Sequence, residues 1–581
     1  MSFTPPVAEQ RFVLDHVVRI EELAATERFA EATPDLVDAI LEGAGRFAAE
    51  TFAPLNRTGD QVGAMLTSKG VIMPEGFPDA YRAYVEGGWG SLAAPVEHGG
   101  QGLPFALATA VLETLGGANM AFALCPTLNV GAIEALVHHG TPEQQALYLP
   151  HLSTGEWTGT MNLTEPQAGS DVGALRTAAT PREDGSFLIK GTKIFISYGD
   201  HDMAENIVHL VLARTPGAPA GTRGISLFLV PKMLVNDDGS LGEANDLRVV
   251  SLEHKMGIHA SPTCVMSYGD NDACLGWLIG EENQGMRAMF TMMNNARLNV
   301  GLQGVQIGER ATQQAAAFAL ERMQSARAGA PSRDPVAIVE HPDVRRMLMR
   351  MKALTMAARA LGYAAAGEVD RVALGDEDAK ARLELLTPLA KAYGTDCGVE
   401  VASLGIQVHG GMGFIEETGA AQHYRDARIP PIYEGTNGIQ AADLVGRKLG
   451  LEGGAVVARL FADIRAEAAG EESLLALVDD CEGAARWLGG NAASADDRMA
   501  GSYPFLTMLS VATAGWLLAR QERIAGELLE RGEGDLAFLE MKRAVARFYL
   551  DQVVPEATGL AAAATAKADI LYAVPAEAFL A

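Results

Sequence analysis

The chain has 581 residues, of which 48% are hydrophobic and 20% charged, and its formal net charge at pH 7 is −27. This length exceeds what one ordinary hydrophobic core supports, so we expect a globular protein of about three or four domains. The strong negative charge and the lack of a basic block exclude nucleic acid and an anionic membrane surface as expected partners.

The cysteines are few and scattered, and none has CxxC spacing. Their odd number argues against a disulfide framework or zinc site and favours a reducing compartment. Residues Met1–Gln10 lack the apolar core of a signal peptide, and the apolar run Val511–Ala519 is shorter than a bilayer span. We therefore expect a cytoplasmic protein without a membrane partner. The five cysteines are Cys125, Cys264, Cys274, Cys397 and Cys481.

Residues 1–157 are predicted to form a helical domain. An apolar stripe with helical spacing runs from Leu36 to Ala48, and Thr33–Pro34 supplies an N-cap followed by proline at the first helical position. Thr141–Pro142 repeats this start signal, and Gln144 stands where it completes a capping box.

Residues 158–280 are predicted to form a small β domain. Compact β-branched and apolar runs alternate there with Gly, Pro and Asp, as in a set of short strands. A turn is expected at Asp184–Gly185. The strand candidates are Phe187–Ile189, Ile194–Ile196, Ile207–Leu212 and Ile225–Val230.

Helical periodicity returns at Gly285 and predicts a helical bundle over residues 281–450, with a polar loop at Ala328–Pro335. Residues 451–581 are rich in Ala, Leu and Glu at helical spacing and predict an additional helical domain. We expect that domain to be interrupted at Gly489–Gly490 and at Gly501–Pro504.

One carboxylate near the end of the bundle is placed for chemistry. Glu434 lies between Tyr433 and Gly435, in a segment that Pro430 and Pro431 keep from being continuous helix. A carboxylate on a rigid turn can be aimed at a substrate carbon and shielded from water, as a general base requires. Taken alone, a solvated or helix-capping glutamate is the simpler interpretation.

Four other motifs accompany this segment along the chain. They are Leu163–Asp171 (LTEPQAGSD), Gly191–Ser197 (GTKIFIS), Lys255–Ile258 (KMGI) and Gly410–Phe414 (GGMGF). Together and in this order, they resemble the acyl-CoA dehydrogenase flavoproteins over about residues 30–450. The resemblance implies a mainly α protein with a central β-barrel-like domain between helical domains. The segment after Gly453 is absent from the shorter members of that family.

The resemblance also implies a reaction, the FAD-dependent α,β-dehydrogenation of an acyl-CoA thioester to the trans-2-enoyl-CoA. A base removes the α-proton while the β-hydrogen leaves as hydride to flavin N5, and an electron-transferring flavoprotein is the expected acceptor. Glu434 matches the family's base. Some relatives carry the base immediately before an arginine that corresponds to Arg297, but Ala296 occupies that position here and cannot act as a base.

The motifs also assign residues to the cofactor and the substrate by resemblance. Phe195 stands where an aromatic Trp is usual, Ser197 retains a hydroxyl near flavin N5, and Gly438 replaces a side chain that touches FAD in many relatives. The expected flavin contacts are Leu163, Thr164, Gly169, Ser170, Phe195, Ser197 and Thr436. The expected substrate contacts are Ser170, Arg297, Tyr433 and Gly435.

A further group matches residues that hold the FAD bound in the neighbouring subunit: Arg322, Gln407, Gly410 and Gly411. Glycines there let the backbone approach a pyrophosphate closely. Because these groups act in trans, the resemblance implies a homodimer. We expect the added segment to pack on its own subunit and cover the surface through which the shorter relatives form tetramers.

Three other functions stay open at this stage. An acyl-CoA oxidase would share the base and the flavin but pass electrons to oxygen. A flavin monooxygenase on this scaffold usually lacks the catalytic glutamate, so Glu434 counts against it. A non-catalytic helical interaction protein would have no reason to keep the base, the flavin hydroxyls and the interface glycines together.

Overall fold

The computed structural model describes residues 3–581, so Met1 and Ser2 at the start of the predicted N-terminal domain lie outside the described residues. By its internal contacts the chain separates into two compact units, which are described one at a time. The first holds Ala24–Asn299 with the residues before Ala8, and the second holds Ala8–Leu23 and Val300–Ala581. The division into four domains stays a prediction.

The first unit begins with helices whose starts follow the predicted signals. Thr33 Oγ1 accepts a hydrogen bond from the Leu36 N–H at 3.4 Å, and the capping box of Thr141 and Gln144 is present. A short hairpin of β1 (Met65–Thr67) and β2 (Gly70–Ile72) interrupts the helices and was not predicted. The helices are α3 (Pro34–Phe47), α4 (Ala53–Val62), α5 (Phe77–Glu86), α6 (Phe105–Ala118), α7 (Met120–His139) and α8 (Pro142–Thr154).

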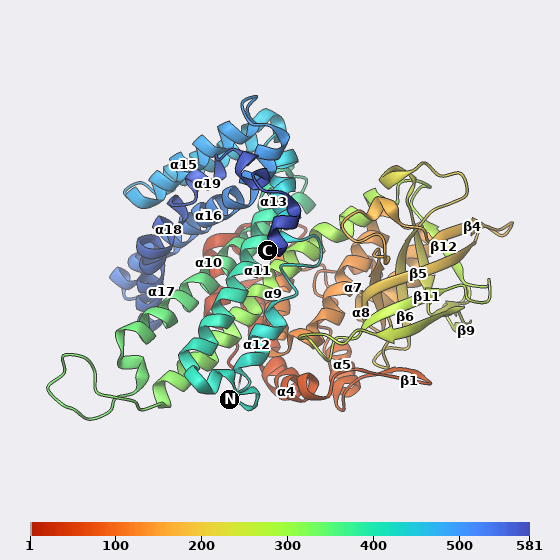
Figure 1. Cartoon of the computed structure of the whole chain (residues 1–581). Helices are drawn as coiled ribbons and strands as arrows, with labels where there is room; N and C mark the ends of the chain where they lie inside the picture. Colours follow the sequence, from red (N-terminus) through yellow and green to blue (C-terminus); the bar gives the residue numbers. More distant parts are fainter. Residues whose placement is uncertain (1–2) are drawn as a thin grey trace. The chain divides into compact units, whose positions relative to one another are not determined.

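An eight-stranded sheet forms the predicted β domain (Figure 1). Its strand order is β10-β11-β5-β12-β7-β6-β3, and β4 pairs with β5. The β3–β6 pair is parallel and the other pairs are antiparallel. A separate two-stranded sheet pairs β8 with β9. The strands are β3 (Trp157–Asn162), β4 (Ala178–Pro181), β5 (Phe187–Ser197), β6 (Asn206–Ala213), β7 (Ser226–Pro231), β8 (Met233–Val235), β9 (Leu241–Ala244), β10 (Leu247–Leu252), β11 (Thr263–Tyr268) and β12 (Leu275–Ile279).

The prediction of two short strands after the Asp184–Gly185 turn is wrong, because Phe187–Ser197 is the single strand β5. Gly191 lies in the middle of β5 and does not break it. A Cβ at Gly191 would stand 2.4 Å from Thr177 Oγ1, so glycine is required for close approach of the backbone rather than for a turn.

Helices α7 and α8 pack against the sheet and fix the position of β3. The stacked rings of His151 and Trp157 lie 4.1 Å apart at the point where β3 begins. The buried core between these helices and the sheet includes Ala132, Leu136, Leu149, Leu152, Trp157, Leu210, Leu212, Leu227 and Leu229. This packing holds the segment that leaves β3, in which several expected flavin contacts lie.

The second unit is helical, as predicted. Its long helices α10 (Pro342–Ala373) and α11 (Glu377–His409) pack along each other, and short α12 (Ala420–Ala427) and α13 (Asn437–Asp443) follow. Helix α9 (Gly285–Glu321) precedes them, and the predicted loop Ala328–Pro335 is confirmed between α9 and α10. The N-terminal residues 8–23, which include most of α1 (Val7–Val13) and of α2 (Ile20–Ala24), belong to this unit.

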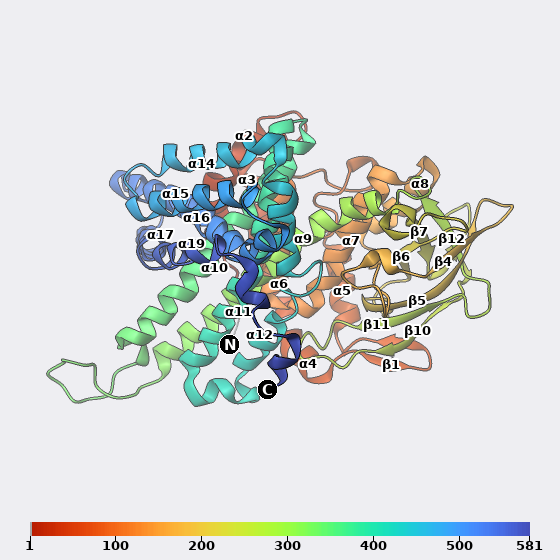
Figure 2. The same ribbon diagram turned by 45° about the horizontal axis from the view of Figure 1, so that its top comes forward.

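The predicted additional helical domain is present and packs on its own chain (Figure 2). Helix α16 lies at its centre and contacts α10, α11 and α13. Gly489 ends α15, so that predicted break is confirmed. The helices are α14 (Ala455–Glu467), α15 (Glu472–Gly489), α16 (Ala495–Arg531), α17 (Leu536–Phe548), α18 (Val554–Thr558) and α19 (Ala561–Ala564).

The predicted break at Gly501–Pro504 is wrong, because these residues lie inside α16. A Cβ at Gly501 would stand 2.2 Å from the carbonyl oxygen of Ala564, so this glycine permits close packing of two segments. Pro504 removes one helical hydrogen bond, at a cost of about 3 kcal/mol in a helix interior. Burial of the apolar side chains that follow it offsets that cost.

Helices α7 and α16 are long and apolar enough to cross a membrane by length and composition, so the short run Val511–Ala519 understated the length of the apolar helix that contains it. Of their apolar windows, 72% and 78% respectively is buried inside the fold, as in the core helices of a globular unit.

All five cysteines are free thiols with buried side chains. Burial raises the pKa of the Cys264 and Cys274 thiols to about 12. At neutral pH these thiols are protonated and pack as small apolar side chains.

Candidate active site

Glu434 lies on a non-helical turn between α12 and α13, as the two prolines predicted. Its backbone has φ of 55°, in the left-handed region, and Gly435 follows with φ of 80°. A residue other than glycine adopts this conformation only where its surroundings enforce it, and such residues concentrate at functional sites. The side chain of Glu434 is half-buried. The turn therefore presents a partly shielded carboxylate in an enforced direction.

Hydrogen bonds close the turn at its C-terminal end. Thr436 is the N-cap of α13, and its hydroxyl accepts from the Ile439 N–H at 3.1 Å. The Gln440 amide donates to the carbonyl oxygen of Gly435 at 3.3 Å. The cap uses the Thr436 hydroxyl as an acceptor and leaves its proton available to another partner, in keeping with the expected flavin contact.

The residue before Glu434 is held by a side chain of α9. The Tyr433 hydroxyl donates a hydrogen bond to Gln303 Oε1, and Gln303 is buried. Burial raises the pKa of Tyr433, so the hydroxyl stays protonated and remains a donor. Gln303 has no motif signal in the sequence and was not predicted.

Two buried side chains support the turn from behind. Lys391 on α11 is 0% exposed, and its Nζ donates to the Pro430 carbonyl oxygen and to Asn437 Oδ1, each at 2.9 Å. The Asn437 N–H donates to the Pro431 carbonyl oxygen at 3.0 Å. Sequence reasoning missed both residues, because nothing in their local pattern shows that they face the turn.

The four residues expected to contact the FAD of the neighbouring subunit lie at or just after the C-terminal ends of α9 and α11. The rings of Phe318 on α9 and His409 on α11 stack 4.5 Å apart, which places the ends of these helices together. Arg322 follows the end of α9, and Gly410 and Gly411 follow the end of α11. Gln407 lies on the last turn of α11 and is exposed, as are these three residues.

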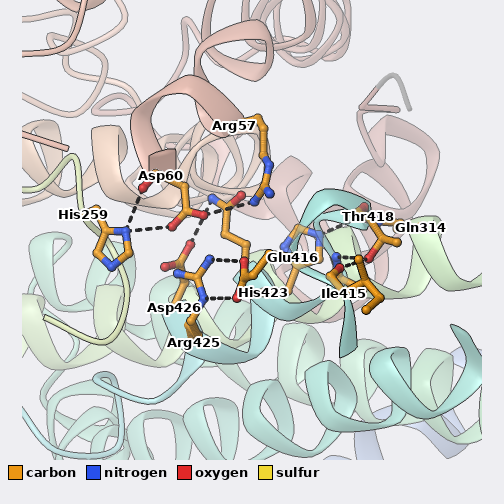
Figure 3. A network of polar contacts seen from close by, with 12 residues as sticks. Arg57, Asp60, His259, Gln314, Ile415, Glu416, Thr418, His423, Arg425 and Asp426 are labelled. Atoms are coloured by element: carbon orange, nitrogen blue, oxygen red, sulfur yellow. Dashed lines mark hydrogen bonds and ion pairs between the residues drawn. The ribbon is translucent and has the colours of Figure 1, made fainter. Parts of the chain in front are cut away.

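The loop after Gly410–Gly411 is tied down by polar contacts (Figure 3). Gln314 on α9 donates to the carbonyl oxygen of Thr418 at 2.7 Å and shares a hydrogen bond with His423 of α12 at 2.9 Å. Arg425 of α12 makes a two-point contact with Glu416, with distances of 3.0 and 3.1 Å. The glycine-rich segment therefore starts with Gly410 as the C-cap of α11, continues as a short 3-10 helix over Gly410–Phe414, and is followed by a loop that these contacts hold in place.

In the first unit, the segment Leu163–Ser170 leaves β3 and lies against β5. The Ile194 N–H donates to the Thr164 carbonyl oxygen at 2.9 Å, and Lys193 Nζ donates to the Leu163 carbonyl oxygen at 3.0 Å. Thr164 is half-buried, and Gly169 and Ser170 are exposed. These are the positions expected to face the flavin and its phosphates.

A buried ion pair organises that segment and was not predicted. Glu165 Oε1 lies 2.8 Å from Lys193 Nζ, and both side chains are buried. Glu165 also accepts from the backbone N–H groups of Arg176 at 2.7 Å and Thr177 at 3.0 Å. Burial alone would raise the pKa of Glu165, but the Lys193 ammonium and these hydrogen bonds outweigh it and lower the pKa to about 2.

Phe195 and Ser197 come from the end of β5. Phe195 has φ of 60° and is 59% exposed, and it lies where the pairing of β5 with β11 shifts its register. Ser197, two residues on, is half-buried. An exposed aromatic ring on an enforced left-handed residue, beside a hydroxyl, suits stacking against a flat ring system.

Arg297 and Ala296 are buried residues of α9 within the first unit. The absence of a carboxylate at Ala296 leaves Glu434 as the base that the motifs support. The expected contact of Arg297 with substrate stays a prediction.

The residues present fit FAD. In the first unit, Phe195 offers a ring face, and Thr164, Ser170 and Ser197 offer hydroxyls. In the second unit, open space surrounds the positions where a Cβ would stand on Gly410 and Gly411, and Gly410 has φ of 60°. The lack of side chains there lets a pyrophosphate approach the backbone closely, and the exposed Arg322 guanidinium can pair with its charge.

Four family models match the chain in sequence. They are the acyl-CoA dehydrogenase N-terminal domain at residues 35–156, its middle domain at 160–270, its C-terminal domain at 283–450, and the acetyl-CoA dehydrogenase C-terminal-like domain at 456–575.

Curated proteins and solved structures are also similar to the chain. The 3-methylmercaptopropionyl-CoA dehydrogenase of Ruegeria pomeroyi is 48% identical over 96% of this chain and 97% of its own length. A butyryl-CoA dehydrogenase of Syntrophomonas wolfei is 36% identical over 90% of each chain. The structure of an acyl-CoA dehydrogenase from Bacillus anthracis complexed with FAD shares the fold with a TM-score of 0.75 and 22% identity, over 94% of this chain and 91% of that one.

Proposed function

The chain belongs to the acyl-CoA dehydrogenase family and dehydrogenates an acyl-CoA thioester with FAD as its cofactor, and from this premise we propose that Glu434 is the catalytic base. The observation that carries the proposal is the turn itself. It holds a half-buried carboxylate at φ of 55°, with backbone and side-chain hydrogen bonds on both sides. Strain of this kind persists where it serves a site.

The proposed role of this chain's residues is to take one proton and stabilise one charge. Glu434 accepts the α-proton of the thioester, and its own N–H donates to the thioester carbonyl oxygen as negative charge develops there. FAD, when bound, would supply the two-electron acceptor for the β-hydrogen. The hydroxyls of Thr164, Ser170 and Ser197 in the first unit, and of Thr436 in the second, are the groups that would hold the cofactor.

For the substrate we propose 3-methylmercaptopropionyl-CoA, with short and medium straight-chain acyl-CoA thioesters as the next candidates. The proposal is supported by the name of the Ruegeria pomeroyi relative and the near-complete coverage of both chains. A panel of acyl-CoA thioesters assayed with an artificial electron acceptor tests it. A higher kcat/KM for butyryl-CoA than for the thioether substrate would favour an ordinary short-chain dehydrogenase of fatty acid β-oxidation.

We propose that electrons pass to an electron-transferring flavoprotein in the cytoplasm, without a membrane partner. An acyl-CoA oxidase is the alternative, because it would use the same base and flavin. Oxygen consumption by the reduced enzyme separates the two: a rate that matches turnover would establish the oxidase.

We also propose a homodimer in which each FAD site is completed by the partner. Next to Arg322 and Gly410–Gly411 in the chain stand exposed apolar side chains, among them Phe414 at 85% exposure. The others are Leu320, Met323, Met412 and Ile415. Apolar side chains gathered in this way are typical of a protein interface.

The decisive experiment for the base is Glu434→Gln. Glutamine keeps the size and shape of the side chain but cannot accept the proton. The rate of flavin reduction by substrate should therefore fall by about 10²–10⁴, with FAD still bound. Glu417→Gln is the matched control, because Glu417 is exposed on the neighbouring loop. A near-normal rate in Glu434→Gln would show that another group takes the proton.

A further inference from the structure

The added C-terminal domain reaches the turn of Glu434 through a chain of hydrogen bonds. Tyr503 on α16 donates its hydroxyl to Asp396 Oδ2 at 2.5 Å. The other carboxylate oxygen of Asp396, on α11, accepts from Asn437 Nδ2 at 2.8 Å. Asn437 is the first residue of α13 and stands three residues after Glu434.

Asn437 and Lys391 together hold both ends of the turn. The Asn437 N–H donates to the Pro431 carbonyl oxygen, and Lys391 Nζ bridges Asn437 Oδ1 and the Pro430 carbonyl oxygen. Asn437 is 4% exposed and Lys391 is 0% exposed. The turn that carries Glu434 is therefore anchored before and after the glutamate in one buried polar cluster.

Asp396 is the residue through which that cluster meets the added domain. Burial raises the pKa of its carboxyl, although the hydrogen bonds from Tyr503 and Asn437 and the Lys391 ammonium act in the opposite direction. The Tyr503 hydroxyl thus compensates for lost water at one carboxylate oxygen. Without it, the half-buried Asp396 would keep Asn437 as a partner but lose one donor to its other carboxylate oxygen.

We propose that the added domain takes part in catalysis through Tyr503, a positioning residue that sets the turn of Glu434 by way of Asp396 and Asn437. The proposal rests on the role of Glu434 as base. It gives the added domain a function besides covering a surface of its own subunit. A small displacement of a catalytic group lowers a rate strongly even when substrate binding is unchanged, so rate and affinity should separate.

Tyr503→Phe is the first test, because it removes only the hydroxyl and the ring is already 38% exposed. The matched control is Tyr549→Phe in the same domain. The Tyr549 hydroxyl is buried and shares a hydrogen bond of 2.6 Å with Tyr393 of α11; in the part of the chain that the structure describes, neither hydroxyl bonds a residue of the Glu434 turn. Removal of either hydroxyl breaks one contact between the added domain and α11.

In stopped-flow flavin reduction by substrate, Tyr503→Phe should lower the limiting rate about 5- to 30-fold, with the substrate Kd unchanged within about twofold. Tyr549→Phe should keep the wild-type rate within about twofold, although its melting temperature should fall more than that of Tyr503→Phe. Equal rates in Tyr503→Phe and wild type would overturn the proposal. An equal loss of rate in both variants would also overturn it, because stability would then explain the effect.

Asp396 supplies a rescue test that stability alone would not reproduce. In Asp396→Asn, the amide oxygen can accept from Asn437 while the amide N–H donates to the Tyr503 oxygen, since a hydroxyl both donates and accepts. We expect a rate within about threefold of wild type for Asp396→Asn and a loss of at least about tenfold for Asp396→Ala. Similar rates in these two variants would contradict a positioning role.

Failure of the proposed function gives a different result. If Glu434 is not the base, Glu434→Gln reduces its flavin at a near-normal rate whatever the Tyr503 variants do. If only the positioning role is wrong, Glu434→Gln stays inactive while Tyr503→Phe equals wild type. FAD absorbance measured on each purified variant ensures that only folded, loaded enzyme is compared.

Discussion

Replacement of Glu165 by glutamine tests whether one buried ion pair holds the segment with the expected flavin contacts. Glu165 is 4% exposed. Its Oε1 accepts from Lys193 Nζ at 2.8 Å and from Thr177 Oγ1 at 2.6 Å, while Oε2 accepts from the Arg176 N–H at 2.7 Å. Glutamine has only one acceptor oxygen. Its NH2 group would therefore point at groups that now donate to Glu165 and could not accept from them.

The expected loss is large because the partner of Glu165 cannot reach water. Lys193 is 0% exposed, and breaking a buried ion pair on one side costs about 3–5 kcal/mol. The free energy of local opening of the segment should fall by this amount, which corresponds to about two to four powers of ten in amide protection. The double variant with Glu165→Gln and Lys193→Met should recover part of the lost protection, because both charges of the buried pair are then removed together.

The same pair predicts a pH dependence. The folded pKa of Glu165 is about 2, below the value near 4.3 of an unfolded glutamate. Its contribution to stability is therefore fully present above about pH 5 and is lost as the pH falls toward 2. The difference in stability between the wild type and Glu165→Gln should shrink over that acidic range.

Hydrogen exchange followed by mass spectrometry measures the effect directly in peptides that cover residues 163–177, because two of those amides donate to Glu165. Glu183→Gln is the control, since Glu183 is exposed on the turn between β4 and β5 and carries the same charge. Protection at pH 7 that is equal in Glu165→Gln and wild type would refute the argument that this pair anchors the segment.

Three other outcomes are expected. Arg322→Ala should lower FAD occupancy, and added FAD should partly restore activity; an unchanged affinity for FAD would make Arg322 an ordinary surface residue. Light scattering at moderate concentration should give the mass of two chains, and a mass of four would show that the added domain does not replace the tetramer contact. Gly501→Ala should lower the melting temperature by several degrees, since the new Cβ would stand 2.2 Å from the Ala564 carbonyl oxygen and overpacking costs about 1–3 kcal/mol. Gly483→Ala, at an exposed position of α15 where a Cβ meets open space, should keep or raise the melting temperature, and equal losses in both variants would refute the packing argument.

Local signals in the sequence were enough for much of this protein. The caps at Thr33 and Thr141, the non-helical turn around Glu434 and the order of helical, β and helical segments follow from backbone preferences that act over a few residues. Glu434 was predicted as the base because its neighbours Tyr433 and Gly435 form part of a motif, and a motif needs no knowledge of distant contacts.

Tertiary structure decided whatever depends on residues far apart in the chain. Glycine and proline at Gly501 and Pro504 suggest a break, yet packing against the segment of Ala564 keeps them helical. Tyr503 and Asp396 are separated by 107 residues, and no periodicity or local preference shows that they meet. Local propensity is worth fractions of a kcal/mol to about 3 kcal/mol per residue, whereas burial and buried hydrogen bonds act together over many residues. Where the two disagree, the contacts between distant segments prevail.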